Sequence, residues 1–475
     1  MGNGNTGFGG IDRDAYIRVG QTMVDVANYG DDIAAAVAAA PAGSAFWLEK
    51  PSYEPTAPIP YVAGNRFVGA NAGLVVIKPG SGFSGSALFE ASLASSGAIT
   101  EVYWENLILD GVTGPTGTLD LIHLDTSTAN NILYNRIKCE NVTFRNARVG
   151  WWHAANNANA GPMNNGTQHR DCTFHNCLVG HLAGGVYGAE ILDCTALQNT
   201  AAAYGTSGVG GINLGSGPTT FYNLSGGHIE GLGNLTGTGT ATENGVNISA
   251  SMFSVGGGLR ISNISQVALS MNTAEDEGAT IDNVLIYGTG YAPVEVSGVS
   301  SGSPLAISRV VADSILQNSS NAPIGAAFDL RSGSIQLTDS WIVGAQPPQA
   351  VYLGFGGAMD SVTIERVVCS PTVSWIGIST QPTYLHIKDC PGYNPVGSSV
   401  PGTAFSIAAS GSDWTNDTGV DGTLYCTAAG TVTAVRVNGV SVSGSLGVGD
   451  TFPVPAGGKW GYTGTAAPTM VFVGN

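Results

Sequence analysis

Two acidic residues of this chain have the spacing that carboxylate chemistry requires. Glu295 stands in Pro293-Val-Glu-Val and Asp329 in Ala327-Phe-Asp-Leu, at the same position of a recurring pattern. If each copy of the pattern forms one coil of stacked strands, the two side chains lie about 5 Å apart. Retaining glycosidases hold two carboxyl groups about 5–5.5 Å apart. The spacing predicts Glu295 and Asp329 as a catalytic pair, with a solvated strand face as the alternative.

The same position of the pattern is aromatic or polar in other copies. Aromatic rings stack on the faces of sugars, while imidazole and amide groups form hydrogen bonds with sugar hydroxyls. We therefore predict an outward strip of glycan-binding residues; the alternative is again a polar face that only contacts water. The candidates are His123, Trp152, His153, His181, Asn213, Asn247 and Tyr352.

A stronger repeat, apolar–x–Asn/Asp–apolar–x–apolar, precedes this pattern and must position it. Examples are Trp104-Glu-Asn-Leu-Ile-Leu and Cys139-Glu-Asn-Val-Thr-Phe. A unit this short cannot bury its own core, so we expect a solenoid of about 11 coils with two strands per coil. Its Asn side chains are expected to stack and to satisfy polar groups at a corner. Later copies centre on Asp171, Asp193, Asn223, Asn263, Asn283, Arg309, Asp339, Arg366 and Asp389.

The two ends of the chain differ from this repeat. Asp31-Asp32 precede Ile33-Ala-Ala-Ala-Val-Ala-Ala-Ala, which predicts a helix that caps the open end of the solenoid. Near the other end, a period-two pattern surrounds Asn438-Gly439, which predicts a β-hairpin. The predicted organisation is an attachment arm over residues 1–24, a β-solenoid over 25–403 and a β-sandwich over 404–475.

Composition excludes several function classes. The formal net charge is −17, which argues against a nucleic-acid partner and against anionic membranes. The seven cysteines have no zinc-type spacing, and Cys172, Cys194 and Cys390 each follow a repeat Asn or Asp, so they are expected in an inward apolar stack. No basic and apolar leader opens the sequence, and no long apolar stretch predicts a membrane span. A virion component released by lysis reconciles a polar, extracellular-type surface with the lack of a leader.

The opening of the chain resembles a known family. Val24-Asp-Val-Ala-Asn-Tyr-Gly, Pro51-Ser-Tyr and Asn65-Arg-Phe-Val-Gly-Ala-Asn resemble the N-terminal module of pectin-lyase-like proteins, which include polygalacturonases, pectate lyases and phage tailspikes. The resemblance implies an all-β, right-handed parallel β-helix. Arg136-Ile-Lys and Gly180-His match polygalacturonase fragments, but in reversed order and without their acidic partners, so no such active site is predicted.

The resemblance also implies a function. We expect a tail fibre or tailspike that binds host-surface glycan as a homotrimer, joins other virion proteins through its N-terminal arm and uses neither a cofactor nor a metal. One alternative is a polysaccharide depolymerase, of glycosidase or lyase type. The other is a structural decoration or vertex protein of a capsid.

Overall fold

The computed structural model divides the chain into two compact units. The first unit comprises Met1–Glu295 with Ser314–Pro323, and the second comprises Val296–Asp313 with Ile324–Asn475. The structure describes residues 21–70, 74–91, 97–112, 117–126, 132–155, 165–184, 187–197, 212–215, 221–230, 245–248, 252–264, 267–272, 279–297, 304–313, 326–344, 347, 349–354, 357–369, 374–391, 393, 405–406, 410–416, 421–455 and 457–474.

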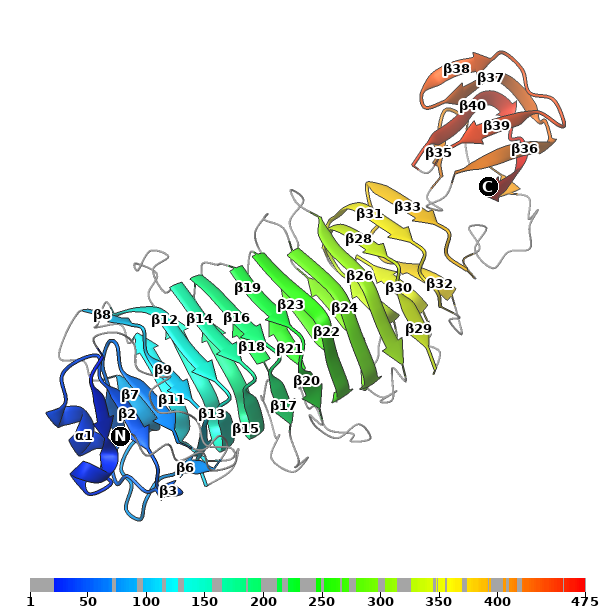
Figure 1. The fold of residues 1–475 in the computed structure, drawn as a ribbon. Helices are drawn as coiled ribbons and strands as arrows, with labels where there is room; N and C mark the ends of the chain where they lie inside the picture. Colours follow the sequence, from blue (N-terminus) through cyan, green and yellow to red (C-terminus); the bar gives the residue numbers. More distant parts are fainter. Residues whose placement is uncertain are drawn as a thin grey trace, which may run out of the picture. The chain divides into compact units, whose positions relative to one another are not determined.

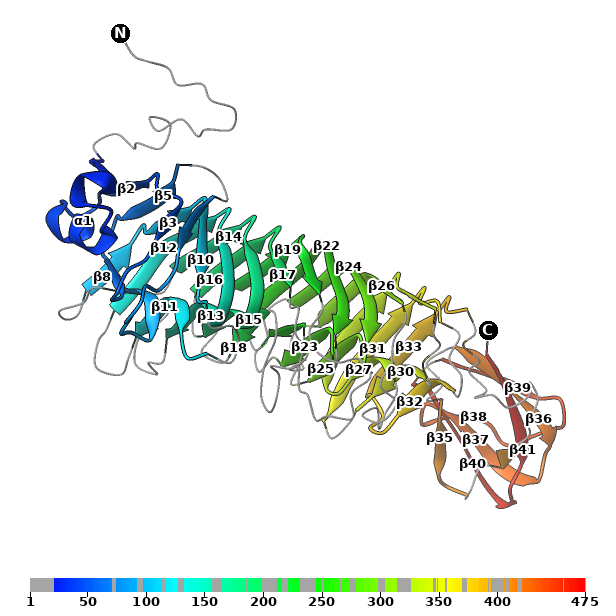
Figure 2. The same ribbon diagram turned by 90° about the horizontal axis from the view of Figure 1, so that it is seen from below.

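The first unit is built from coils of parallel strands, and the fold is the right-handed parallel β-helix that the sequence predicts (Figures 1 and 2). Each coil contributes to three sheets. The first sheet contains β1 (Met23–Asp25), β2 (Ala45–Leu48), β5 (Arg66–Gly69), β8 (Gly97–Thr100), β9 (Tyr103–Glu105), β12 (Ile132–Glu140), β14 (Asn165–Arg170), β16 (Tyr187–Leu192), β19 (Phe221–Ser225) and the first parts of β22 (Met252–Ile264) and β24 (Ala279–Thr289).

The other two sheets are formed by the rest of each coil. The second sheet contains β3 (Ser52–Tyr53), β6 (Val75–Ile77), β10 (Leu107–Asp110), the first parts of β13 (Thr143–Ala155) and β15 (Thr173–Gly184), β17 (Thr195–Leu197), β20 (His228–Glu230) and the ends of β22 and β24. The third contains β4 (Ile59–Tyr61), β7 (Ala87–Ala91), β11 (Asp120–Thr126), the ends of β13 and β15, β18 (Ile212–Gly215), β21 (Val246–Ile248) and β23 (Leu269–Asn272), while β25 (Val294–Ser297) spans the division between the units.

The repeat Asn/Asp is a bend between two strands, not a residue inside one strand. Asn106 and Asn141 have φ of 57° and 51°, in the left-handed region, where Asn and Asp are enriched. The bend turns the chain from the first sheet to the second while the apolar residues on both sides stay inward. The expectation of two strands per coil is therefore corrected to three, because one motif supplies the end of one strand and the start of the next.

Two centres of the repeat were misplaced. Asn223 lies within β19, paired with Glu190 and Ser254, and Gly226 takes the bend instead. Only glycine fits there, because φ is 69° and a Cβ would lie 2.1 Å from Asp193 Oδ1. Asn263 (φ 58°) lies at a second bend, between the second and third sheets, as Asn146 does.

Asn side chains stack at both bends, as expected. At the first bend, Asn141 Nδ2 donates to Asn106 Oδ1 at 2.8 Å. At the second, Asn176 Nδ2 donates to Asn146 Oδ1 at 2.8 Å, and Asn146 Nδ2 donates to Asp110 Oδ1 at 3.0 Å. These ladders satisfy the polar groups of the corners and fix the alignment of successive coils.

The core of the first unit is a column of large apolar side chains. Phe144 and Phe174 stack with ring centroids 4.9 Å apart, and Trp104 packs against Trp151 at 5.9 Å. All seven cysteines are free thiols, and Cys172 and Cys194 are buried, as an inward stack requires. Burial raises the pKa of the Cys172 thiol well above its usual value.

The N-terminal end of the coils carries the predicted cap helix (Figure 1). It is α1 (Ile33–Ala39), which follows a 3-10 helix, η2 (Val26–Tyr29). Asp32 is the N-cap and accepts from Ala35 N at 3.0 Å. Ile33 and Ala36 are buried, so the helix covers apolar ends of strands. Among the described residues no helix has the length and apolar character needed to cross a membrane.

The second unit has a three-sheet pattern of the same kind. Its first sheet contains the start of β26 (Leu305–Asp313), β28 (Gly333–Thr338), β31 (Met359–Glu365) and β33 (Tyr384–Lys388). Its second contains the end of β26, β29 (Trp341–Val343) and a single bridge at Val368, and its third contains β27 (Ala326–Leu330), β30 (Gln349–Leu353) and β32 (Ser374–Ile378). The bends here are Arg309, Asp339, Arg366 and Asp389, with φ from 48° to 54°.

The second unit also contains the predicted β-sandwich. Asn438 (φ 50°) and Gly439 (φ 79°) make the predicted hairpin turn. Leu424, Trp460 and Phe472 lie in the apolar core of the sandwich. Its two antiparallel sheets are β34 (Phe405–Ser406), β41 (Thr469–Gly474), β36 (Gly422–Ala428) and β39 (Thr451–Val454), then β35 (Asp413–Thr415), β40 (Lys459–Ala466), β37 (Thr431–Val437) and β38 (Val440–Ser443).

Candidate functional site

Two of the predicted glycan-binding residues form one rigid unit on the third sheet. His123 of β11 and Trp152 of β13 are partners on neighbouring coils, and their rings stack at 4.4 Å with an interplanar angle of 9°. Both side chains are half-buried. Asp120 and Arg148 lie beside them and fix the stack.

A buried carboxylate organises this unit. Asp120 is fully buried and accepts from Arg148 Nε at 2.8 Å and Nη2 at 2.5 Å, and its Oδ2 lies 3.6 Å from His123 Nδ1. The Arg148 guanidinium also lies 4.9 Å from the Trp152 ring centroid. Burial raises the pKa of Asp120, and the hydrogen bonds from Arg148 oppose that rise. The Trp152 ring is thus already engaged by a cation and an imidazole.

The register of the third sheet corrects two other candidates. His181 pairs with Trp151, whose side chain is buried, and Leu182 takes the place between Trp152 and Asn213. His153 pairs with buried Leu124. Neither histidine therefore lies in the column of Trp152. A shift of one residue moves a strand position to the opposite face, and Gly180-His-Leu is too short for its apolar pattern to fix that phase.

The remaining strip candidates lie on the third sheet of their own units. Asn213 pairs with Asn247, which pairs with Ser270. In the second unit, Tyr352 lies between Asp329 and Gly377 and is half-buried.

The predicted catalytic carboxylates fall in different units. Glu295 is half-buried at the end of the first unit. Asp329 belongs to the second and is only 1% exposed. Arg331 Nη2 and Nε donate to Asp329 Oδ2 at 2.8 and 3.1 Å. Such a buried ion pair gives Asp329 a structural role within its own unit.

The first sheet carries a polar cleft that sequence reasoning missed. Its volume is about 870 Å³ and it crosses four coils of the first unit. It is formed by two outward columns of β5, β9, β12 and β14, together with the adjoining first bend. The lining residues are Arg66, Tyr103, Glu105, Asn106, Lys138, Glu140, Asn141, Gln168, Arg170 and Asp171.

The inner part of the cleft is rigidly held. Arg66 Nη2 contacts Glu105 Oε1 at 2.5 Å, and both side chains are about 90% buried, with exposures of 11% and 9%. The Arg66 guanidinium and the Lys138 ammonium lie 5.2 and 5.9 Å from the Tyr103 ring centroid. Tyr103 is 7% exposed and acts as the floor that positions both cations.

The outer part of the cleft offers charges to a ligand. In the strand register, Glu140 lies opposite Glu105 of the preceding coil and opposite Arg170 of the following coil. Glu140, Arg170 and Asp171 are exposed, and Lys138 is half-buried. Charged donors and acceptors thus alternate over a few ångströms, an arrangement that suits a ligand with many hydroxyl groups.

A weak sequence signal for this cleft was present. Glu105, Glu140 and Arg170 are the variable residues just before three successive repeat Asn/Asp residues. Two residues before each of these variable residues, on the same face of the strand, lie Tyr103, Lys138 and Gln168 respectively. Because the motif Asn is a bend, both sets face outward beside it. No group of three or more His, Cys, Asp or Glu side chains that could hold a metal ion occurs in the described part of the chain.

The chain was compared with known proteins. No protein-family model matches the sequence, and the curated proteins searched give no match. A similar solved structure is the A-module of mannuronan C-5 epimerase AlgE6 from Azotobacter vinelandii, with 14% identity, a TM-score of 0.43 and coverage of 78% of this chain and 100% of that chain. A tailspike protein mutant of E. coli bacteriophage HK620 in complex with pentasaccharide has 11% identity, a TM-score of 0.41 and coverage of 96% and 87%.

A third similar structure is ORF18 of Geobacillus virus E2, with 12% identity, a TM-score of 0.34 and coverage of 95% and 76%. The chain is a parallel β-helix protein. Its strand pairing shows this directly. The activity must be argued from the β-helix's own surface.

Proposed function

We propose that this β-helix is a virion appendage, a tail fibre or tailspike, that binds a host-surface glycan through the cleft of the first sheet. The supporting observation is the cleft itself: ten polar or aromatic side chains line about 870 Å³. The buried Arg66–Glu105 pair holds the floor rigid, so little conformational entropy is lost when a ligand binds.

The chemistry of the cleft fits a carbohydrate. Lys138 and Arg170 donate, Glu140 and Asp171 accept, and the amides of Asn141 and Gln168 do both. A sugar presents many hydroxyls that both donate and accept, so each can pair with these groups. On this proposal the His123–Trp152 stack and Asn247 form a secondary polar surface on the third sheet of the first unit, and Tyr352 is a separate candidate in the second unit.

A depolymerase is the second candidate, and one observation favours it. Glu105 and Glu140 are register partners on successive coils, so their backbones lie about 4.8 Å apart, close to the carboxyl spacing of retaining glycosidases; Glu140 is exposed, whereas Glu105 is buried and paired with Arg66. The pair Glu295 and Asp329 predicted from the sequence is the other set for this activity. Assembly as a homotrimer and attachment through the N-terminal residues are further parts of the proposal that rest on the family resemblance.

Binding and product release separate these functions. Purified protein is incubated with a panel of bacterial surface polysaccharides, and retention, reducing ends and unsaturated products are measured. Retention that Lys138→Ala weakens about tenfold, or about 1.4 kcal/mol, supports the cleft. The matched control is Lys388→Ala, an exposed lysine of the first sheet in the second unit, outside the cleft.

Each other outcome overturns part of the proposal. Retention unchanged in Lys138→Ala would move the site to the third sheet. Product release that Glu140→Gln abolishes, or that Glu295→Gln or Asp329→Asn abolishes, would make the protein an enzyme and identify its carboxylates. No retention on any polysaccharide would favour a structural capsid protein.

A further inference from the structure

The second sheet of the first unit carries a serine and a histidine in direct contact, apart from the cleft of the first sheet and the ring stack of the third. His228 of β20 and Ser262 of β22 lie on adjacent coils (Figure 1), and His228 Nε2 is 2.9 Å from Ser262 Oγ. His228 pairs with Arg260 in the strand register, so Ser262 is its diagonal neighbour on the outward face. A hydroxyl within hydrogen-bond reach of an imidazole is the arrangement of an activated nucleophile.

A carboxylate lies beside this pair. Glu230, on the same strand and face as His228, has its Oε2 atom 3.7 Å from His228 Nε2. Glu230 is also the register partner of Ser262, and its Oε1 accepts from Asn263 Nδ2 at 3.4 Å. When His228 takes up a proton at Nε2, the positive charge therefore forms next to a carboxylate, which stabilises the protonated imidazole.

The group is open to a ligand. The side chains of His228 and Glu230 are 35% and 43% exposed. Tyr287, the register partner of Ser262 on the following coil, is 41% exposed. Arg260 is exposed on the same face, two residues before Ser262. An aromatic ring beside the hydroxyl offers a surface for a sugar, and a guanidinium can stabilise an oxyanion.

We propose that Ser262 and His228 form an acyl-transfer site that hydrolyses carboxylic esters, with the O-acyl groups of a glycan as the substrate class. The choice of a glycan rests on the proposed function, whereas the choice of an ester rests on the site itself. An alcohol leaves a tetrahedral intermediate more readily than an amine does, so an ester suits an exposed pair of this kind better than an amide.

The chain's own groups and water complete the reaction. Ser262 Oγ attacks the carbonyl carbon of the ester while its proton moves to Nε2 of neutral His228, which carries its own proton on Nδ1. His228 then protonates the departing oxygen, so the alcohol leaves and the acyl group stays on Ser262. Water, deprotonated by His228, attacks the acyl-serine and releases the carboxylic acid, and the proton returns to Ser262 Oγ. Arg260 stabilises the oxyanion of both intermediates, and Glu230 is a positioning residue that acts through His228.

The test is the hydrolysis of p-nitrophenyl acetate by the whole chain, followed as release of p-nitrophenol. We expect Ser262→Ala and His228→Gln each to lower kcat/KM about a hundredfold or more. The control for the serine is Ser254→Ala, a half-buried serine of the same strand that lies on the first sheet. The control for the histidine is His175→Gln, elsewhere on the second sheet, because an imidazole by itself also hydrolyses this ester. Both controls should hydrolyse the ester as the wild type does.

Two further measurements examine the mechanism. Glu230→Gln should lower kcat about tenfold and leave KM unchanged, because the carboxylate acts on the protonated imidazole and not on the ester; a purely structural role would not give this split. A serine-directed fluorophosphonate should label Ser262, as located by mass spectrometry of the digested protein, and should label His228→Gln more slowly. Hydrolysis that persists in Ser262→Ala, or the absence of label on Ser262, would overturn the proposal.

The substrate class is tested with an O-acetylated bacterial polysaccharide, from which the wild type should release acetate and Ser262→Ala should not. Cleavage of the small ester without release of acetate from any acetylated polysaccharide would overturn the assignment to glycan esters. The small ester requires no glycan contact, so its hydrolysis is independent of whether the cleft of the first sheet retains a polysaccharide.

Discussion

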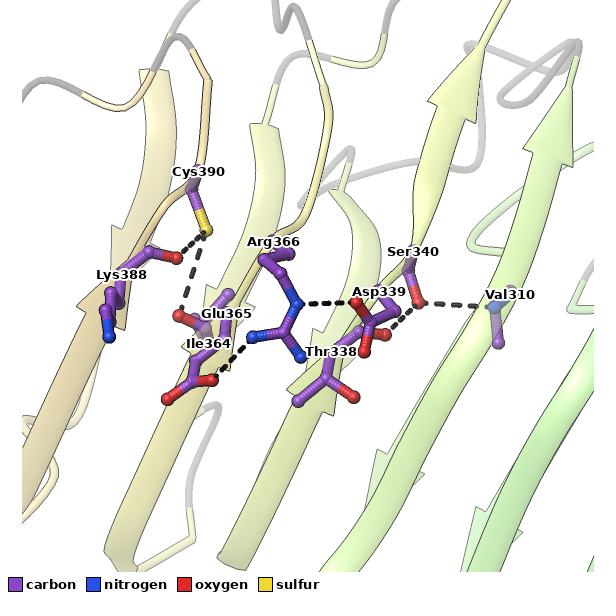
Figure 3. Close-up of polar contacts among 9 residues, drawn as sticks. All are labelled: Val310, Thr338, Asp339, Ser340, Ile364, Glu365, Arg366, Lys388 and Cys390. Atoms are coloured by element: carbon purple, nitrogen blue, oxygen red, sulfur yellow. Dashed lines mark hydrogen bonds and ion pairs between the residues drawn. The ribbon is translucent and has the colours of Figure 1, made fainter.

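Arg366 binds Asp339 of the preceding coil at two points, with Nε 2.6 Å from Oδ1 and Nη2 2.8 Å from Oδ2 (Figure 3). Both residues occupy the left-handed bend, with φ of 54° and 48°. The first unit uses a hydrogen bond between Asn141 and Asn106 at the same bend. Two kinds of side-chain ladder thus solve one geometric problem.

The first prediction separates the ion pair from the strain of the bend. Arg366→Ala removes the ion pair and leaves a residue at positive φ, whereas Arg366→Asn also removes it but supplies a residue that tolerates this conformation. We expect Arg366→Ala to be the less stable of the two, by a few tenths to about 1 kcal/mol. Urea unfolding, monitored by circular dichroism, measures the difference. Equal stability of the two variants would show that the bend is not strained in this coil.

The second prediction concerns acid. The hydrogen bonds from Arg366 hold the pKa of Asp339 below its usual value. Because the pKa in the folded state is depressed, the ion pair adds stability above the unfolded pKa of about 3.9, and this contribution is lost as the pH falls through the folded value. The melting temperature of the wild type should therefore fall more steeply than that of Arg366→Ala below about pH 4. High salt should reduce the difference, since both groups are exposed.

The coils and their bends could be predicted from the sequence because each bend favours particular residue types. Asn and Asp are enriched at positive φ, so Asn106, Asn141 and Asp171 mark successive corners, and the apolar residues beside them mark the core. The same reasoning failed at Gly226, where the corner is too crowded for any side chain. A glycine carries no periodic signal in a chain that contains 69 of them.

The candidate sites were less predictable, because they depend on register. The pairing of His123 with Trp152 followed from two long, well-patterned strands. His181 was misplaced by one residue, since its apolar pattern is short. The cleft requires Glu105, Glu140 and Arg170 to meet across coils of unequal length, 35 residues between the bends at 106 and 141 and 30 between those at 141 and 171. Only the aligned strands reveal that these side chains line one surface.

The third prediction tests the support of the His123–Trp152 stack. Asp120→Ala removes the buried partner of Arg148 and leaves its charge, 36% exposed, beside the Trp152 ring. Removal of one member of a buried ion pair costs about 3 kcal/mol, and we expect that loss in the free energy of unfolding, with a smaller near-ultraviolet circular dichroism signal as the stack loosens. The control is Glu54→Ala, which removes the partner of Lys78 in an exposed pair at 3.0 Å, with side chains 54% and 38% exposed, and should cost less than about 1 kcal/mol. Equal losses in the two variants, or an unchanged aromatic signal in Asp120→Ala, would show that Asp120 does not position the rings.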